Sequence, residues 1–168
     1  WNLVRNVMMK KQKNIMTNNF EFFAPTKVIF GKGAENETGK QIKEFGATSV
    51  LIVYGGGNVK RSGLLEKVEN TLSDAQITFC ELGGVVPNPH LDKVYEGIRI
   101  GKSKNVDFLL AVGGGSVIDT AKAIAYGLAE PQKDVWELFD HTRMARKCIP
   151  VASVLSIAAA GSETSKGC

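Results

Sequence analysis

The sequence lacks any long apolar run, and this absence argues against a membrane protein. No uninterrupted apolar stretch in its 168 residues approaches the ~20 residues that a membrane-spanning helix needs. Hydrophobic residues make up 43% of the chain and charged residues 23%, as is usual for globular proteins. We therefore expect a soluble, cytoplasmic protein that has no membrane partner.

Cysteine and histidine are scarce, and neither is arranged as a metal site. The three cysteines, Cys80, Cys148 and Cys168, are far apart and form no C-x-x-C motif. This pattern indicates reduced thiols rather than disulfides or zinc ligands. The two histidines, His90 and His141, are interpreted as surface or capping residues rather than as metal ligands.

Acidic residues are missing from the first 15 positions, which hold four of the 21 basic residues. Without those four, 17 basic residues face 17 acidic ones, so the net charge of +4 arises in this leader. The neutral remainder offers no basic patch for a nucleic acid. We interpret residues 1–15 as a disordered or non-native leader, because their composition favours upstream sequence or a ragged terminus over a targeting peptide.

Short apolar runs alternate with amphipathic stretches along the rest of the chain. Residues 50–54 and 108–112 form continuous apolar runs, which are typical of strands covered on both faces. Strands are also predicted over residues 77–82 and 149–155, and helices over residues 34–45, 64–72, 90–104 and 117–129. This alternation predicts an α/β fold with a mostly parallel sheet and helices on both faces. Arg143, Arg146 and Lys147 are assigned to a solvated loop before the last strand.

Three glycines between a predicted strand and a predicted helix form the strongest chemical signal. Gly113, Gly114 and Gly115 carry no Cβ atom, so an anion can approach their backbone closely. The unpaired N–H groups and the dipole of the following helix also favour an anion, such as a pyrophosphate. Alternatively, Ser116 and Asp119 match a capping box, which requires no ligand. The two interpretations are compatible.

A second glycine run follows the first buried strand and contains Gly56 and Gly57. In nucleotide-binding sheets, an acidic residue near such a strand end holds the adenosine ribose and disfavours a 2′-phosphate. Here the strand is followed by glycine, with Asn58, Lys60 and Arg61 just beyond. The space and the nearby cations favour NADP(H) over NAD(H), although a plain surface turn with solvated cations fits the composition equally well.

Five segments together resemble a known family. The chain is similar to the iron-containing alcohol dehydrogenases, and most to their NADPH-dependent butanol dehydrogenase branch, from about Phe20 to the end. The segments that carry the resemblance, in order, are residues 23–33, 54–57, 84–89, 112–119 and 161–163. One departure is Ala160, where members of the family commonly have threonine before the Gly-Ser-Glu triplet.

The resemblance implies a Rossmann-like dinucleotide-binding domain over residues 16–160 and the start of an all-helical metal-binding domain over residues 161–168. In this reading the chain transfers hydride between NADP(H) and a small primary alcohol or aldehyde, and the complete protein is a homodimer. The family binds a divalent metal, iron, through one aspartate and three histidines beyond the triplet. No such position exists in this chain, so the 168 residues alone are expected to be inactive, with no catalytic or metal residue.

The resemblance also implies a role for each candidate site residue. Residues 113–116 would bind the pyrophosphate, and Asp119 would lie near the nicotinamide. Gly56, Gly57 and Asn58 would surround the adenosine 2′-phosphate, and Ser156 would approach the nicotinamide ribose. Two alternatives remain at this point: a truncated, non-catalytic fragment that binds nucleotide weakly or not at all, and a protein similar to glycerol dehydrogenase.

Overall fold

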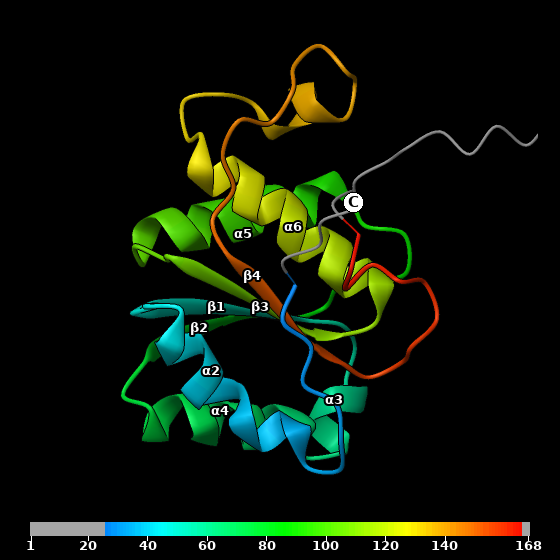
Figure 1. The fold of residues 1–168 in the computed structure, drawn as a ribbon. Coiled ribbons are helices and arrows are strands. Elements are labelled where there is room, and N and C mark those ends of the chain that lie inside the picture. Colours follow the sequence, from blue (N-terminus) through cyan, green and yellow to red (C-terminus); the bar gives the residue numbers. More distant parts are fainter. Residues whose placement is uncertain (1–25, 166–168) are drawn as a thin grey trace, which may run out of the picture.

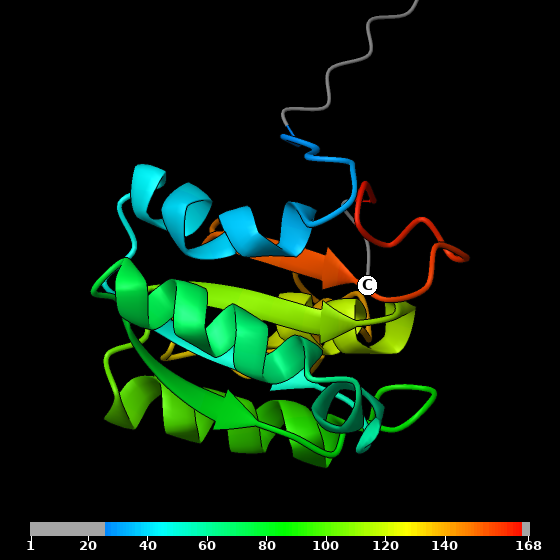
Figure 2. The same ribbon diagram turned by 90° about the horizontal axis from the view of Figure 1, so that it is seen from below.

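A parallel sheet of four strands forms the centre of the molecule. The computed structural model describes residues 26–165, so the predicted leader and residues 166–168 lie outside the described residues. The sheet has the strand order β2-β1-β3-β4 and contains β1 (Ser49–Tyr54), β2 (Thr78–Leu82), β3 (Phe108–Gly113) and β4 (Val151–Leu155). All neighbouring strands pair in parallel, so their carboxyl ends lie at one edge (Figure 2). The predicted parallel α/β fold is confirmed.

Helices cover both faces of the sheet, as the alternating pattern predicts (Figure 1). One face carries η1 (Ala34–Glu37), α2 (Thr38–Glu44) and α4 (Leu64–Asp74), and the other carries α5 (Leu91–Ser103) and α6 (Gly115–Ala129). The short helices α3 (Asn58–Arg61) and η2 (Val135–Leu138) lie in the connections after β1 and after α6. Within residues 26–165, no helix has both the length and the apolar character needed to cross a membrane.

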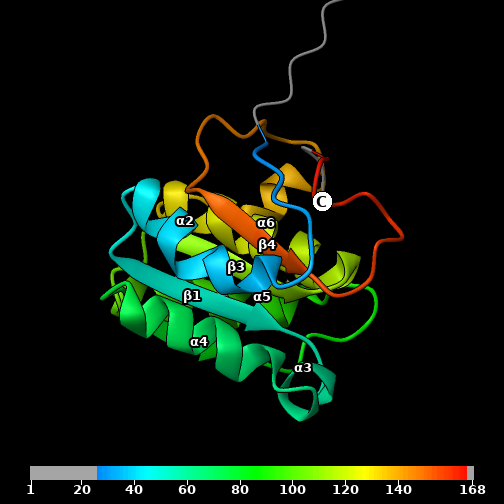
Figure 3. The same ribbon diagram turned by 60° about the horizontal axis from the view of Figure 1, so that its bottom comes forward.

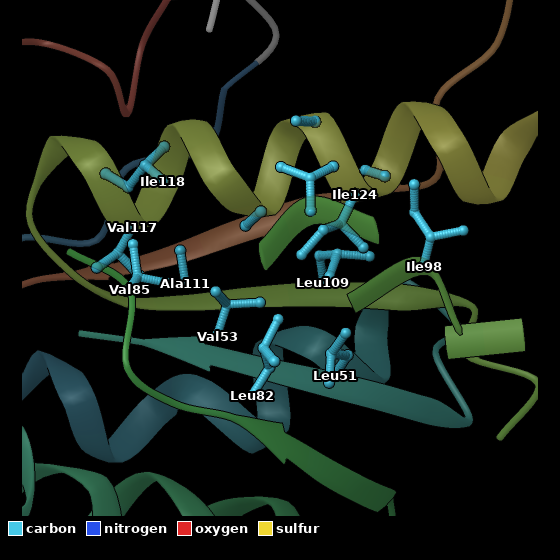
Figure 4. Close-up of a cluster of buried hydrophobic side chains, with 14 of the residues drawn as sticks. Leu51, Val53, Leu82, Val85, Ile98, Leu109, Ala111, Val117, Ile118 and Ile124 are labelled. Carbon is cyan, nitrogen blue, oxygen red and sulfur yellow. The ribbon is translucent and has the colours of Figure 1, made fainter. Parts of the chain in front are cut away.

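The two central strands are buried on both faces and divide their side chains between two cores. Leu51 and Val53 of β1 point to the α5–α6 side with Leu109 of β3 (Figure 4), whereas Val50 and Ile52 point to the α2–α4 side. All five side chains have no exposed surface. This period-two division follows from the pleat of a strand, and it explains why these runs read as continuous apolar sequence.

Glycines allow close helix packing on both sides of the sheet. A Cβ atom on Gly39 of α2 would lie 1.9 Å from the backbone oxygen of Thr71 in α4. A Cβ atom on Gly97 of α5 would lie 2.3 Å from the side chain of Ile124 in α6. At these positions the fold itself therefore requires glycine.

The structure corrects the interpretation of one basic residue in the connection between α6 and β4. The Arg143 side chain is only 14% exposed and pairs with Glu130 at 2.6 Å and Glu137 at 3.0 Å. It is therefore a structural ion-pair residue rather than part of a solvated loop. Arg146 and Lys147 are exposed, as predicted.

Candidate functional site

The topological switch point, where the strand order changes direction, lies between β1 and β3 at the carboxyl edge of the sheet. From β1 the chain passes to β2 on one side, and β3 lies on the other side of β1. Tyr54 pairs with Val112, so β1 and β3 end next to each other. Figure 3 shows α3 just beyond the end of β1, at the same edge as the loop that follows β4. In parallel α/β sheets, ligands bind in the crevice at this switch point.

The turn after β3 (residues 113–116, the β3 turn) leads directly into α6. Gly114 is the N-cap, and α6 begins at Gly115. Ser116 is therefore inside the helix, and no side chain caps its N-terminus, so the alternative interpretation of Ser116 and Asp119 as a capping box is wrong. The first N–H groups of an α-helix have no intrahelical acceptor. Those of Gly115 and Ser116 have none elsewhere among the described residues.

Gly114 differs from the glycines on either side of it. A Cβ atom on Gly113 would lie 2.8 Å from Val117, and one on Gly115 would lie 3.1 Å from the Cβ of Ala160. A Cβ atom on Gly114 would meet nothing within 4 Å, and its φ of −98° is accessible to any residue. The fold therefore does not require glycine at position 114. What glycine leaves there is open space at the N-terminus of α6, where the N–H groups of Gly115 and Ser116 have no acceptor among the described residues.

The turn after β1 (residues 55–58, the β1 turn) also contains one open glycine. Gly55 approaches the backbone oxygen of Val85 closely, whereas a Cβ atom on Gly56 would meet nothing within 4 Å. Arg61 folds back over this turn: its Nη1 lies 2.7 Å from the position of a Cβ on Gly57, and its Nη2 donates to Asn58 Oδ1 at 3.3 Å. An exposed guanidinium group thus lies directly beside Gly57 and Asn58.

The neighbouring cation, Lys60, is engaged elsewhere. Its Nζ lies 3.6 Å from Glu81 Oε2 and 4.9 Å from the centre of the Tyr54 ring. The Tyr54 hydroxyl donates to the same Glu81 oxygen at 2.8 Å. Interaction with the Tyr54 hydroxyl and with the Glu81 carboxylate raises the pKa of Lys60. The sequence groups Lys60 and Arg61 together, but in the structure only Arg61 lies against the β1 turn.

The remaining candidate residues lie at the same edge but in different positions. The Ser156 N–H donates to the Gly113 oxygen at 3.0 Å, which joins the loop after β4 to the β3 turn. The Ser156 side chain is exposed. Asp119 is partly exposed and lies three residues beyond Ser116 in α6, a spacing that places the two side chains on the same side of the helix.

One residue of this region, Lys122, was missed by sequence reasoning. The buried Lys122 side chain of α6 donates to the backbone oxygens of Ser162 at 2.7 Å and Ser165 at 2.6 Å. Ser162 is itself buried and lies beside Gly115. The sequence does indicate an unusual environment for Lys122, because it is the only charged residue between Thr120 and Ala129.

The described residues contain no cluster of metal ligands. No three side chains of histidine, cysteine, aspartate or glutamate between residues 26 and 165 converge on a point where a metal ion could bind. His90 is the N-cap residue of α5 without a side-chain capping bond, and His141 is exposed.

Comparison with protein families and known proteins gives consistent matches. The family model for iron-containing alcohol dehydrogenase matches residues 25–168. The NADH-dependent butanol dehydrogenase A of Clostridium acetobutylicum is 44% identical over 144 residues, which are 86% of this chain and 36% of that protein. The NADPH-dependent aldehyde reductase YqhD of Escherichia coli is 38% identical over 152 residues, which are 89% of this chain and 38% of that protein.

A solved structure agrees with the fold. The crystal structure of an NADH-dependent butanol dehydrogenase A from Thermotoga maritima superposes with a TM-score of 0.82 at 42% identity. The match covers 85% of this chain and 36% of that structure. The chain therefore spans less than two fifths of the length of each of these three relatives.

Proposed function

This chain belongs to the iron-containing alcohol dehydrogenase family, and on that premise we propose that it binds NADP(H) at the switch point between β1 and β3. The bound nucleotide would serve an oxidoreductase that interconverts a primary alcohol and its aldehyde. When bound, the reduced nicotinamide supplies a hydride to the carbonyl carbon of the aldehyde, and a proton completes the alcohol. The described residues bind and orient the nucleotide.

The open space at Gly114 carries this proposal. A pyrophosphate beside Gly114 would accept hydrogen bonds from the N–H groups of Gly115 and Ser116, with the positive end of the α6 dipole behind them. Hydrogen bonds of this kind involve a charged acceptor, and each contributes roughly 1.5–3 kcal/mol. A purely structural turn would not need glycine at this position. Ser156 would then adjoin the nicotinamide ribose and Asp119 the nicotinamide end.

Arg61 supports NADP(H) as the preferred cofactor. Gly56 leaves space after β1, and the Arg61 guanidinium group lies beside Gly57 and donates to Asn58. A guanidinium group binds a phosphate through two parallel hydrogen bonds. Relatives described as NADH-dependent and as NADPH-dependent both match the chain, so the support for NADP(H) comes from this chain's own residues. The Glu81 carboxylate, on the neighbouring strand β2, is held by Tyr54 and Lys60, which leaves it less able to bind a ribose.

The cofactor preference is tested with two matched charge removals. Arg61→Ala and Lys60→Ala each remove one cation from the same short helix. We expect Arg61→Ala to weaken NADPH binding by about 10- to 100-fold, the loss of one charged hydrogen-bonding partner, and to leave NADH binding unchanged. Lys60→Ala should change neither affinity by more than about twofold, because an exposed ion pair contributes little.

Isothermal titration of each variant with NADPH and NADH measures this difference. If both variants lost NADPH affinity equally, only the general positive potential would matter, and the role of Arg61 would be contradicted. A wild-type protein that binds NADH more tightly than NADPH would refute the cofactor preference, although dinucleotide binding would stand.

The activity itself is tested on the complete gene product. We expect consumption of NADPH in the presence of a short-chain aldehyde such as butyraldehyde, followed at 340 nm. The metal that the resemblance implies has no ligand set among residues 26–165. The predicted homodimer and cytoplasmic location stay predictions, to be checked by light scattering and by fractionation.

A further inference from the structure

A buried ammonium group lies in the middle of α6. Lys122 is 9% exposed and is flanked by the buried Ala121 and Ala123. Burying a charged group is unfavourable unless hydrogen bonds replace its lost hydration. The Lys122 Nζ donates to the backbone oxygens of Ser162 and Ser165, which are 40 and 43 residues away in the sequence. This side chain therefore joins α6 to the last segment that the structure describes.

The segment held by Lys122 is a compact turn. The N–H groups of Thr164 and Ser165 both donate to the Gly161 oxygen, at 3.1 and 3.2 Å. Ser162 within the turn is 8% exposed. The segment over residues 161–165 is called the Lys122-bound turn below.

The Lys122-bound turn packs on the first turn of α6. From the position of a Cβ atom on Gly115, Ser162 Oγ lies 3.2 Å away and the Cβ of Ala160 lies 3.1 Å away. Figure 1 shows this segment, in red, against the beginning of α6. Gly115 supplies one of the two N–H groups that the proposed function assigns to the pyrophosphate. The turn thus forms a wall beside the anion site.

We infer that Lys122 is a positioning residue of the nucleotide site. Its ammonium group fixes the Lys122-bound turn against Gly115, and the turn then limits where a pyrophosphate can lie. Lys122 acts through main-chain oxygens of the turn and does not itself touch the nucleotide. This inference rests on the proposed function and adds to it a residue that controls the pyrophosphate side of the site but not the adenosine side.

Lys122→Met tests the inference, because methionine keeps much of the length of lysine but loses the donors and the charge. Two probes separate the two sides of the site: NADPH spans both glycine turns, whereas 2′,5′-ADP has no pyrophosphate and would occupy the β1 turn. We expect Lys122→Met to weaken NADPH binding about tenfold, the loss of one well-placed hydrogen bond at the pyrophosphate. The affinity for 2′,5′-ADP should stay unchanged.

Hydrogen exchange gives an independent measurement of the turn itself. The amides of Thr164 and Ser165 should exchange at least about tenfold faster in Lys122→Met, because their opening would no longer break the Lys122 contacts. Ile124→Val serves as the control. Ile124 is fully buried in the same helix and packs against Gly97 of α5, so its shortening destabilises the core without touching the turn. In this control, neither the ratio of the NADPH and 2′,5′-ADP affinities nor the exchange rate of the two amides should change.

Each alternative outcome is distinct. An equal loss of affinity for NADPH and 2′,5′-ADP, or wild-type NADPH affinity despite faster exchange, would overturn the inference. If Lys122→Met does not fold, Gly161→Ala loosens the turn from its own side, because Gly161 has a φ of +72° that alanine adopts poorly. That variant must then also weaken NADPH binding and leave the affinity for 2′,5′-ADP unchanged. A wild-type protein that binds neither probe would refute the proposed function, and with it this inference.

Discussion

Gly114 offers a direct test of whether the β3 turn exists for a ligand. The substitution Gly114→Ala adds one methyl group at a position where the protein places no atom within 4 Å. The backbone there is extended, with φ −98° and ψ −169°, so alanine fits without strain. Alanine is a poorer N-cap than glycine, but it also reduces the conformational freedom of the unfolded chain by about 0.4–1 kcal/mol. Because these two effects offset, we expect the stability to change by less than about 1 kcal/mol.

The same methyl group should interfere strongly with binding. It would occupy the space through which a pyrophosphate reaches the N–H groups of Gly115 and Ser116. Losing one hydrogen bond to a charged phosphate weakens binding by roughly 1.5–3 kcal/mol, or about 10- to 100-fold in the dissociation constant. Gly114→Ala should therefore weaken NADPH binding while leaving the free energy of unfolding nearly unchanged.

Thermal unfolding and NADPH titration, performed on the same preparations, measure both quantities. Gly39→Ala is the matched control, because its Cβ would lie 1.9 Å from the Thr71 oxygen, at the packing of α2 on α4 and outside both glycine turns. We expect Gly39→Ala to cost about 1–3 kcal/mol or more and so to lower Tm by roughly 2–4 °C per kcal/mol. Its NADPH affinity below Tm should stay that of the wild type. Wild-type NADPH affinity in Gly114→Ala would refute the placement of the pyrophosphate.

Two further predictions concern the frame that holds the site. Asp107 accepts hydrogen bonds from the backbone N–H groups of Thr48 and Ser49 and from the Thr48 hydroxyl. Burial alone would raise the pKa of Asp107, but these hydrogen bonds outweigh burial, so the pKa is lowered. The stability that follows from a lowered pKa is present above the unfolded value of about 4 and is lost as the pH falls through the folded value. Asp107→Asn should thus cost about 1 kcal/mol in urea unfolding at pH 7, and this cost should shrink as the pH falls below about 4. A cost that stays constant as the pH is lowered would contradict the pKa argument. Arg143→Gln should lower Tm clearly more than Arg146→Gln, which removes the same charge from an exposed side chain; equal shifts would show that the Arg143 ion pairs add nothing.

Much of the fold is predictable from the sequence because burial leaves a direct pattern. The apolar runs over residues 50–54 and 108–112 indicate strands covered on both faces, and the structure confirms both. Helix positions follow in the same way from apolar spacing. The start of α6 was predicted two residues late, because the N-cap is Gly114 rather than a side chain that can cap. A glycine N-cap leaves no side-chain signal in the sequence.

The candidate site is only partly predictable, because its details depend on contacts between distant segments. The sequence suggests that both glycine turns bind an anion, but not that Gly114 and Gly56 are the open positions. It also cannot separate Arg61 from Lys60, since Glu81, which binds Lys60, lies on another strand. The roles of individual residues toward a nucleotide stay predictions until the binding experiments are done.

The two glycine turns belong to different structural units of the chain, and this separation has an evolutionary consequence. The β1 turn leads into α3 and the β3 turn into α6, and the two turns begin side by side where Tyr54 pairs with Val112. A mutation near Asn58 can change the charge around one end of a dinucleotide without moving the helix that would bind its centre. Selection could therefore exchange one cofactor for the other in few steps, while the rest of the binding site stays intact.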